Sequence, residues 1–246
     1  MTQAVETSAL TRIFDGRTAV DSLNLSVPAG EIFGLVGPDG AGKTTTMRLL
    51  VGILDPTSGD ARVLGVPLSR LDSIRPKIGY MSQRFGLYED LTVAENLRFF
   101  GQLHGVTGGE FRERSSRLLA FAGLEPFTRR LAGQLSGGMK QKLGLSCALI
   151  HSPEILFLDE PTAGVDPVSR REFWRLLYDL LQKKVTIFLA TSYMDEAQRC
   201  GRLGFLHDGG LIQMDTPEKI RESAGEGASL EEAFLKKVRD LDAGKG

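Results

Sequence analysis

A glycine-rich turn between an apolar run and a helix start most constrains what this chain can fold into. The run Ile32–Val36 contains only apolar residues and one glycine, and residues 37–44 then read Gly-Pro-Asp-Gly-Ala-Gly-Lys-Thr. This is the spacing G-x-x-x-x-G-K-S/T, in which glycines allow a tight turn whose backbone N–H groups converge on phosphate. A helix starting at Gly42 adds a partial positive charge at its N-terminus. The segment predicts a phosphate-binding loop between a buried strand and a helix.

Two side chains of this loop have roles that follow from their chemistry. Lys43 can reach the β- and γ-phosphates of a nucleoside triphosphate, and the Thr44 hydroxyl can ligate Mg²⁺. A glycine-rich turn with a surface lysine is the plainer alternative, but the complete spacing and the flanking elements favour phosphate binding. The predicted nucleotide-binding residues of this segment are Gly37, Pro38, Asp39, Gly40, Ala41, Gly42, Lys43, Thr44 and Thr45.

A second apolar run, at residues 155–158, ends in two adjacent carboxylates, Asp159 and Glu160. Asp159 can hold Mg²⁺ through water, and Glu160 can polarise an attacking water as general base. Acidic residues are common at strand ends, so the pair gains its meaning from the phosphate loop in the same chain. Lys43 and Glu160 are the predicted catalytic residues, and Thr44 and Asp159 are predicted metal ligands.

Short apolar runs alternate with helical patterns, which predicts an α/β fold with a mainly parallel sheet. Residues 19–33 alternate and end in a Pro-Ala-Gly turn, which indicates antiparallel strands in an N-terminal β segment. Residues 84–150 have an all-helical pattern in which Thr92 and Glu95 have capping-box spacing. We therefore expect one domain over residues 1–246, with a helical subdomain inserted at about 84–150.

The last part of the chain carries two further helix starts. Thr216 precedes a proline at the first helical position, and Ser229 with Glu232 forms a second capping-box pattern. These patterns predict a short helical C-terminal tail at residues 216–246.

Composition excludes several classes of protein. Lys plus Arg (30) nearly balance Asp plus Glu (31), so no basic excess indicates nucleic-acid binding. Cys147 and Cys200 are too few for a disulfide framework or a metal cluster, which favours a reducing cytosol. The apolar runs are strand-sized, whereas a membrane-spanning helix needs about 20 apolar residues. We expect neither a nucleic-acid partner nor a membrane span in this chain.

A serine–glycine segment at residues 135–141, Leu-Ser-Gly-Gly-Met-Lys-Gln, carries a family resemblance. Ser136 is a predicted helix cap, and the glycines leave the first helical amides open to an anion. A capped surface helix is the alternative. The segment resembles the signature sequence of ATP-binding cassette proteins, which implies a P-loop NTPase core, ATP and Mg²⁺ as ligands, and ATP hydrolysis. By this resemblance the residues that close over ATP held by a second cassette are Ser136, Gly137, Gly138 and Gln141.

Other elements of the family occur in order along essentially the whole chain. Phe14 lies where the family has an aromatic that stacks on adenine, although a lone phenylalanine is more often a core residue. Gln83 matches a glutamine that contacts nucleotide and Mg²⁺ before the helical subdomain. Asp166, in the sequence Ala-Gly-Val-Asp, matches a loop that crosses the interface between two cassettes.

The chain departs from the family pattern at two positions. Asp39 stands where asparagine is usual, and its charge would weaken nucleotide binding unless it points away or pairs. Ser192 occupies the switch position, where the family has histidine. Serine is shorter and cannot carry a positive charge, so it is a weak substitute beside a γ-phosphate. A regulatory cassette with little hydrolysis is therefore the alternative to an active ATPase.

The resemblance implies two partners: a second cassette, as homodimer, heterodimer or tandem fusion, and a transmembrane permease on another chain. The cassette would then lie in the cytoplasm at the inner face of the membrane. Residues 83–92 and 164–171, with the ending Ser-Leu-Glu-Glu-Ala-Phe-Leu, resemble exporter cassettes, and Asp39 with Ser192 makes the pattern most similar to the first cassette of tandem efflux ATPases. A soluble cassette of translation or DNA maintenance is a third reading. It is disfavoured because coiled-coil insertions and basic linkers are absent from the sequence.

Overall fold

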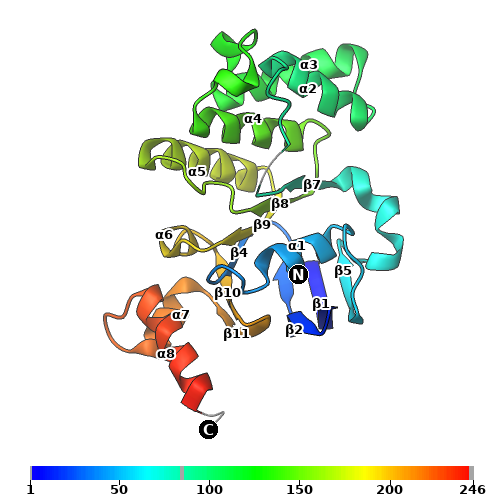
Figure 1. Cartoon of the computed structure of the whole chain (residues 1–246). Helices are drawn as coiled ribbons and strands as arrows, with labels where there is room; N and C mark the ends of the chain where they lie inside the picture. Colours follow the sequence, from blue (N-terminus) through cyan, green and yellow to red (C-terminus); the bar gives the residue numbers. More distant parts are fainter. Residues whose placement is uncertain (1, 84–85, 244–246) are drawn as a thin grey trace. The chain divides into compact units, whose positions relative to one another are not determined.

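The structure, a computed structural model, describes residues 2–83 and 86–243. Contacts between residues divide the chain into two compact units. The first unit comprises Met1–Ile74 and Thr186–Gly246, and the second unit comprises Arg75–Val185. Figure 1 labels the elements of both, and each unit is described by itself.

The described part of the first unit contains three parallel strands, two of which are buried along their whole length. Strand β4 (Ile32–Val36) pairs in parallel with β9 (Thr186–Thr191) and with β10 (Arg202–His207). Every residue of β4 and β9 is buried, which explains their continuous apolar sequences. Strand β11 (Gly210–Asp215) adds an antiparallel edge beside β10. The predicted α/β fold with a mainly parallel core sheet is confirmed.

An antiparallel sheet forms the rest of the β structure of this unit. Its long central strand, β1 (Gln3–Phe14), pairs with β2 (Arg17–Leu23), β3 (Ser26–Pro28) and β5 (Ser58–Val63). The short strand β6 (Val66–Pro67) follows beside β5. The antiparallel β segment is thus confirmed, whereas sequence reasoning missed β1, because its apolar positions are interrupted by bulges at Leu10 and Arg12.

Four α-helices occur among the described residues of the first unit. Helix α1 (Lys43–Leu50) follows the glycine-rich loop, and the single-turn α6 (Met194–Ala197) follows β9. In the tail, α7 (Pro217–Ala224) is capped by Thr216. Helix α8 (Leu230–Ala243) starts with a capping box, in which Ser229 and Glu232 bond each other's backbone N–H groups. The structure thus has helices α7 and α8 in the segment where a helical tail was predicted, and residues 244–246 lie outside the described part.

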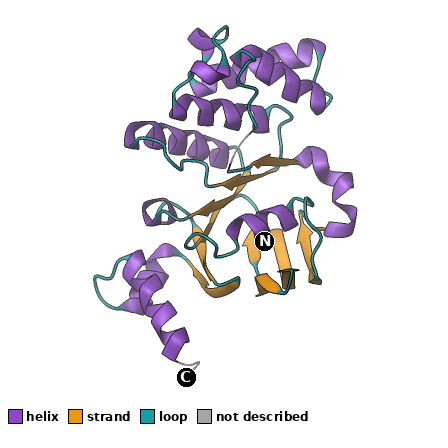
Figure 2. Cartoon of the chain, in the orientation of Figure 1, coloured by secondary structure: helices purple, strands orange, loops and turns teal. Residues whose placement is uncertain are grey.

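The boundary between the units, after Ile74, lies within the 3₁₀ segment η1 (Leu68–Lys77). In the second unit, two parallel strands, β7 (Ile78–Met81) and β8 (Ile155–Asp159), pair with Met81 opposite Leu158. Helix α5 (Pro167–Gln182) follows β8. Figure 2 shows the strands of this unit in orange among its helices.

Between β7 and β8, the described residues from 86 to 150 form helices and connecting turns. The helices are α2 (Val93–Leu103), α3 (Gly108–Ala122) and α4 (Gly137–Leu149), with 3₁₀ turns η2 (Glu125–Phe127) and η3 (Ala132–Gln134). Leu97, Leu119 and Leu143, one from each α-helix, pack in a common core. Thr92 and Glu95 form the expected capping box. Residues 84 and 85, where the predicted helical stretch begins, lie outside the described residues.

Within the described residues, no helix is both long enough and apolar enough to cross a lipid bilayer.

Candidate nucleotide site

The glycine-rich loop joins β4 to α1 through backbone conformations that only glycine adopts easily. Gly40 has φ 81° and Gly42, the N-cap of α1, has φ 102°, both in the left-handed region. A Cβ on Gly37 would lie 2.2 Å from the Leu206 carbonyl oxygen, and one on Gly42 would lie 2.3 Å from that of Ala19. These glycines are therefore required by packing as well as by the turn.

Lys43 lies across this loop. Its buried Nζ donates to the carbonyl oxygens of Gly37 at 2.6 Å and of Pro38 at 3.0 Å. The ammonium group is thus held over the turn where phosphate is expected. Asp39, like its neighbours Pro38 and Gly40, is exposed.

Strand pairing brings the switch position to the same edge as the loop. In the parallel pair of β4 and β9, Val36 lies opposite Thr191, and the Gly37 N–H donates to the Thr191 carbonyl at 3.3 Å. Ser192 follows Thr191 directly and is half-buried. The loop and Ser192 therefore continue from adjacent carboxyl ends of one sheet, where ligands bind in such folds.

Sequence reasoning missed a buried carboxyl group behind this edge. Glu196, on α6, is fully buried, and its Oε2 accepts a 2.6 Å hydrogen bond from the Thr191 hydroxyl. The Tyr193 N–H also donates to the Thr191 hydroxyl oxygen, at 3.1 Å. These bonds fix the turn that carries Ser192. The sequence gives no local signal for Glu196, because α6 reads Met-Asp-Glu-Ala and the neighbouring Asp195 has the same charge.

Phe14 ends β1 at the tight turn into β2 and is 37% exposed. Its ring is therefore on the surface, as the adenine-stacking prediction requires. The Arg12 guanidinium carbon lies 4.5 Å from the ring centroid, in the range of a cation–π contact. Arg12 was not among the predicted residues, because its contact with the Phe14 ring depends on the irregular register of β1 around Arg12.

In the second unit, two predicted metal ligands lie at one strand edge. Because Met81 and Leu158 are paired, Gln83 after β7 and Asp159 at the end of β8 reach the same carboxyl edge. Asp159 is fully buried and Gln83 is exposed. Glu160, 5% exposed, has φ 50°, a left-handed conformation that costs a non-glycine residue energy and is often found at functional sites.

The signature segment caps α4 as predicted. The Met139 N–H donates to the Ser136 hydroxyl at 3.3 Å, and Ser136 and Gly137 are both exposed. Gly138 is buried: a Cβ there would lie 2.4 Å from the Cβ of Ser169 on α5. The second signature glycine is therefore needed where α4 crosses the start of α5. Gln141 lies one turn later and is half-buried.

Asp166 caps α5. Its Oδ1 accepts from the N–H groups of Val168 at 3.0 Å and Ser169 at 2.9 Å. Hydrogen bonds from the Ser169 side chain and backbone lower the pKa of the Asp166 carboxyl from its ordinary value, so it stays ionised. The residue predicted to cross a cassette interface thus also has a local role, and Ser169 links it to Gly138.

The predicted metal ligands form a donor set that suits Mg²⁺. Thr44 offers a hydroxyl, Asp159 a carboxylate and Gln83 an amide oxygen, and Mg²⁺ prefers oxygen ligands of these types. Thr44 lies in the first unit, and the other two lie in the second. No cluster of three or more His, Cys, Asp or Glu suited to a metal occurs in the described part of the chain.

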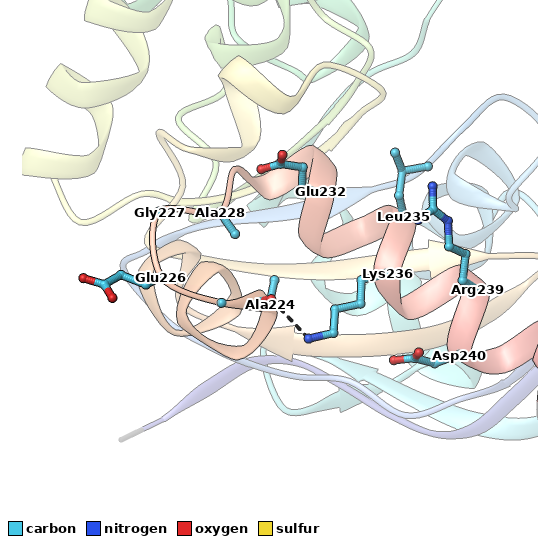
Figure 3. Close-up of a pocket in the computed structure, with 10 residues that line it drawn as sticks. Ala224, Glu226, Gly227, Ala228, Glu232, Leu235, Lys236, Arg239 and Asp240 are labelled. Atoms are coloured by element: carbon cyan, nitrogen blue, oxygen red, sulfur yellow. Dashed lines mark hydrogen bonds between the residues drawn. The ribbon is translucent and has the colours of Figure 1, made fainter.

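A hollow of about 600 Å³ in the first unit, drawn in Figure 3, is a poor match for a triphosphate. It lies between the loop after α7 and helix α8, and its lining carries both signs of charge: Glu226, Glu232 and Asp240 with Lys236 and Arg239. Lys236 is already bonded to the Ala224 carbonyl at 3.1 Å. None of the predicted nucleotide residues lines it.

Residues 20–163 match the family described as ABC transporter. The matched span contains the glycine-rich loop, the signature segment and the carboxylates after β8. The chain belongs to this family. It is an ABC transporter ATP-binding domain, and Phe14, Asp166 and Ser192 lie outside the matched span.

Relatives of this ABC domain are proteins of drug resistance and export. It is 44% identical over 243 residues to "Probable multidrug ABC transporter ATP-binding protein YbhF" of Escherichia coli (strain K12). That alignment covers 97% of this chain and 42% of YbhF. It is also 40% identical over 226 residues to the "Daunorubicin/doxorubicin resistance ATP-binding protein DrrA" of Streptomyces peucetius, covering 91% of this chain and 68% of DrrA.

Solved structures confirm the fold of the ABC domain. "Structure of ATP binding subunit of ABC transporter" superposes with TM-score 0.85 at 28% identity, covering 96% of this chain and 99% of that one. A second solved structure has TM-score 0.78 at 28% identity, covering 86% of this chain and 98% of that one. It is described as a dimeric post-hydrolysis state of the cassette MJ0796 bound to ADP and Pi. The predicted fold class and family are thereby confirmed.

Proposed function

We propose that this ABC domain binds Mg²⁺-ATP and hydrolyses it to drive a membrane exporter. The observation that carries the proposal is the loop of residues 37–44, in which Lys43 is buried over a turn that only glycines permit. Phosphoryl transfer needs positioning and charge neutralisation more than covalent chemistry, and this loop supplies both.

The proposed roles follow from the position of each residue. The amides of residues 37–45 and Lys43 hold the phosphates, and the exposed face of Phe14 stacks on adenine. Thr44, Asp159 and Gln83 hold Mg²⁺, which neutralises charge on the β- and γ-phosphate oxygens. Glu160 accepts a proton from the attacking water, and the fixed backbone after β8 holds its carboxylate in place.

A second cassette completes the site in this proposal. Ser136 and Gly137 expose the N-terminal amides of α4, and Asp166 lies exposed at the start of α5. Val168, beside Asp166, is an apolar residue that is 68% exposed, which supports a protein surface there. Two-fold pairing would place the signature of each copy against the phosphate loop of the other.

The second cassette belongs to a homodimer, a heterodimer or a tandem fusion. The chain spans 42% of the length of YbhF, which leaves room there for a second cassette of similar size. Together with Ser192 and Asp39, this supports a tandem arrangement with the present chain as the first cassette.

The membrane side of the proposal rests on relatives and on surface chemistry. The relatives are named for multidrug transport and drug resistance, which supports export by a permease on another chain at the inner face of the membrane. Tyr88, Phe99 and Leu103 form an exposed apolar surface at the start and outer side of α2, and the Tyr88 and Phe99 rings lie 4.6 Å apart. Such a surface is suited to a protein partner.

Glu160→Gln in the purified chain tests the hydrolytic role. We expect ATP hydrolysis to fall by about 100-fold or more, because a general base is lost, while ATP affinity measured by calorimetry is retained. Glu154→Gln is the matched control: that carboxylate precedes the same strand, is exposed and pairs with Lys77 at 2.8 Å. Wild-type turnover in Glu160→Gln would refute the assigned base. Absence of ATP binding with millimolar Mg²⁺-ATP in the wild type would refute the nucleotide site itself.

A second candidate, a regulatory cassette that binds ATP and hydrolyses it slowly, is favoured by one observation. Ser192 stands at the edge beside the loop with a short neutral hydroxyl in place of an imidazole. In that case ATP would close the pair of cassettes, and the partner site would perform most of the hydrolysis.

A further inference from the structure

The second unit contains a hollow that none of the nucleotide residues lines. It has a volume of about 320 Å³ and lies between α3, the turn after α4 and the end of α5, helices labelled in Figure 1. Its lining residues are Arg114, Arg117, Leu118, Phe121, Leu149, Ser152, Pro153, Leu180, Lys183 and Val185. All of them belong to the second unit.

The inner wall of this hollow is apolar. Leu118 and Phe121 lie on one face of α3, and buried Leu149 and Leu180 close the wall from α4 and α5. Helix positions three and four apart share a face, so Arg114 and Arg117 line the same side of α3 as these two residues. One helix face therefore presents two guanidinium groups next to an apolar wall.

Three cations and no carboxylate occur among the lining residues. Arg114 bonds Glu110 at 2.6 Å and donates to the Ile150 carbonyl at 3.1 Å, which fixes its guanidinium group. Arg117 pairs with Glu113 on the exposed side of α3. Together these groups leave one positive charge in excess, that of Lys183.

Lys183 occupies a defined place at the mouth of the hollow. It is the C-cap of α5, and its Nζ lies 5.2 Å from the centroid of the Phe121 ring across the hollow. This cation–π contact places the ammonium group directly beside the apolar wall. A ligand that enters would meet the positive charge and the apolar surface together.

We propose that this hollow binds an amphipathic anion, a medium-chain acyl carboxylate whose head pairs with Lys183 and whose chain packs on Leu118, Phe121 and Leu180. A volume of 320 Å³ holds about ten water-sized groups, which is the size of an octanoate ion. Pockets of this volume with an apolar lining and a few polar groups are typical of small-ligand sites. The site is separate from the proposed ATPase function, because it uses none of the nucleotide residues.

Titration of the purified chain with octanoate, in the absence of nucleotide, tests this proposal. Binding is followed by calorimetry and by methyl NMR shifts of Leu118, Leu180 and Val185. We expect saturable binding at or below millimolar concentration, with shifts of these methyls, and about tenfold weaker binding of octanol, which has the same chain without the charge.

A variant that lacks the positive charge of the hollow tests whether octanoate binding needs that charge. Lys183→Gln should weaken octanoate binding about tenfold, since the charge-assisted bond to the carboxylate is lost. Lys184→Gln is the matched control, because Lys184 is an exposed lysine beside Lys183 that does not line the hollow, and it should bind as the wild type does.

Three outcomes would overturn the proposal: no octanoate binding at millimolar concentration, equal binding of octanol and octanoate, or unchanged binding in Lys183→Gln. Unfolding curves of each variant show that a loss of binding is not a loss of fold.

Discussion

The side chain of Asn96 and the backbone of Tyr88 hydrogen-bond each other in both directions. The Tyr88 N–H donates to Asn96 Oδ1 at 2.9 Å, and Asn96 Nδ2 donates to the Tyr88 carbonyl at 3.0 Å. Nδ2 also lies within hydrogen-bond distance of the Leu91 and Thr92 carbonyls. A fully buried amide on α2 thus fixes the segment that precedes the helix, and with it the exposed rings of Tyr88 and Phe99.

Asn96→Ala should destabilise the protein by about 1–3 kcal/mol, because the part-buried backbone groups of Tyr88 and Leu91 lose their hydrogen-bond partner. Urea unfolding followed by circular dichroism measures this change. Gln102→Ala, on an exposed position of the same helix, is the control and should stay within about 0.5 kcal/mol of the wild type. A cost of Asn96→Ala no larger than that of the control would contradict the bonding described here.

Gly138→Ala should cost about 1–3 kcal/mol, since its Cβ would lie 2.4 Å from the Ser169 Cβ and 2.5 Å from its Oγ. The adjacent Gly137→Ala is the matched control, because a Cβ at Gly137 meets nothing within 4 Å. Thermal unfolding of both variants checks the difference. In the double variant with Ser169→Gly the overlap is removed, so the added cost of Gly138→Ala should largely disappear in a double-mutant cycle. Additive effects would show that the contact is not the cause.

Ser192→His should raise ATP turnover about tenfold or more if the serine limits the site, because an imidazole reaches further and can carry positive charge toward the γ-phosphate. Steady-state phosphate release measures this. Ser58→His, at an exposed position that starts β5, is the control and should leave turnover unchanged. Unchanged turnover in Ser192→His would mean that Ser192 does not limit hydrolysis.

Acidification should destabilise the protein through His151. This ring stacks on His104 with centroids 3.8 Å apart, its Nε2–H donates to the Ile78 carbonyl at 3.0 Å, and its buried Nδ1 has no hydrogen-bond partner. Burial first, then the neighbouring His104 and Arg114, lower the pKa of His151 to about 4. Burial also lowers the pKa of His104.

The direction of this pH effect on stability follows from proton binding. Between pH 6.5 and pH 4 the unfolded chain binds a proton at His151 that the folded chain does not bind, so stability falls as the pH falls through this window. The loss is roughly 1–2 kcal/mol once the partial exposure of the ring is discounted. Urea midpoints at pH 7.0 and 5.0 should therefore differ less in His151→Gln than in the wild type. His207→Gln is the control, and an equal pH dependence in all three proteins would contradict this account.

Much of the candidate site could be predicted because its elements are local. The spacing of glycines and Lys43, the cap at Ser136 and the carboxylates after an apolar run each depend on residues a few positions apart. Backbone turns and helix caps are decided at that range, so the chain itself indicates them. The structure confirms the loop, the cap of α4 and the strand before Asp159.

Other features depend on residues far apart in the chain. From the sequence alone, Gly34 interrupts the apolar strand β4 without an evident reason. In the structure a Cβ at this position would lie 2.8 Å from the Sγ of Cys200, so glycine is needed for packing. Burial raises the pKa of the Cys200 thiol above its ordinary value, so it acts as a small apolar group. Strand β1 could not be found from periodicity, because bulges shift its alternation.

The sequence by itself determined the local features of the candidate site: the spacing of the glycine-rich loop, two carboxylates after an apolar run and a capped helix start at Ser136. Only the tertiary structure decided which of these groups share an edge or a contact, such as Ser192 with Gly37 through strand pairing and Gly138 with Ser169 through helix packing. The physical reason is that local bonding specifies turns and caps, whereas register and close packing arise from segments that meet only after folding.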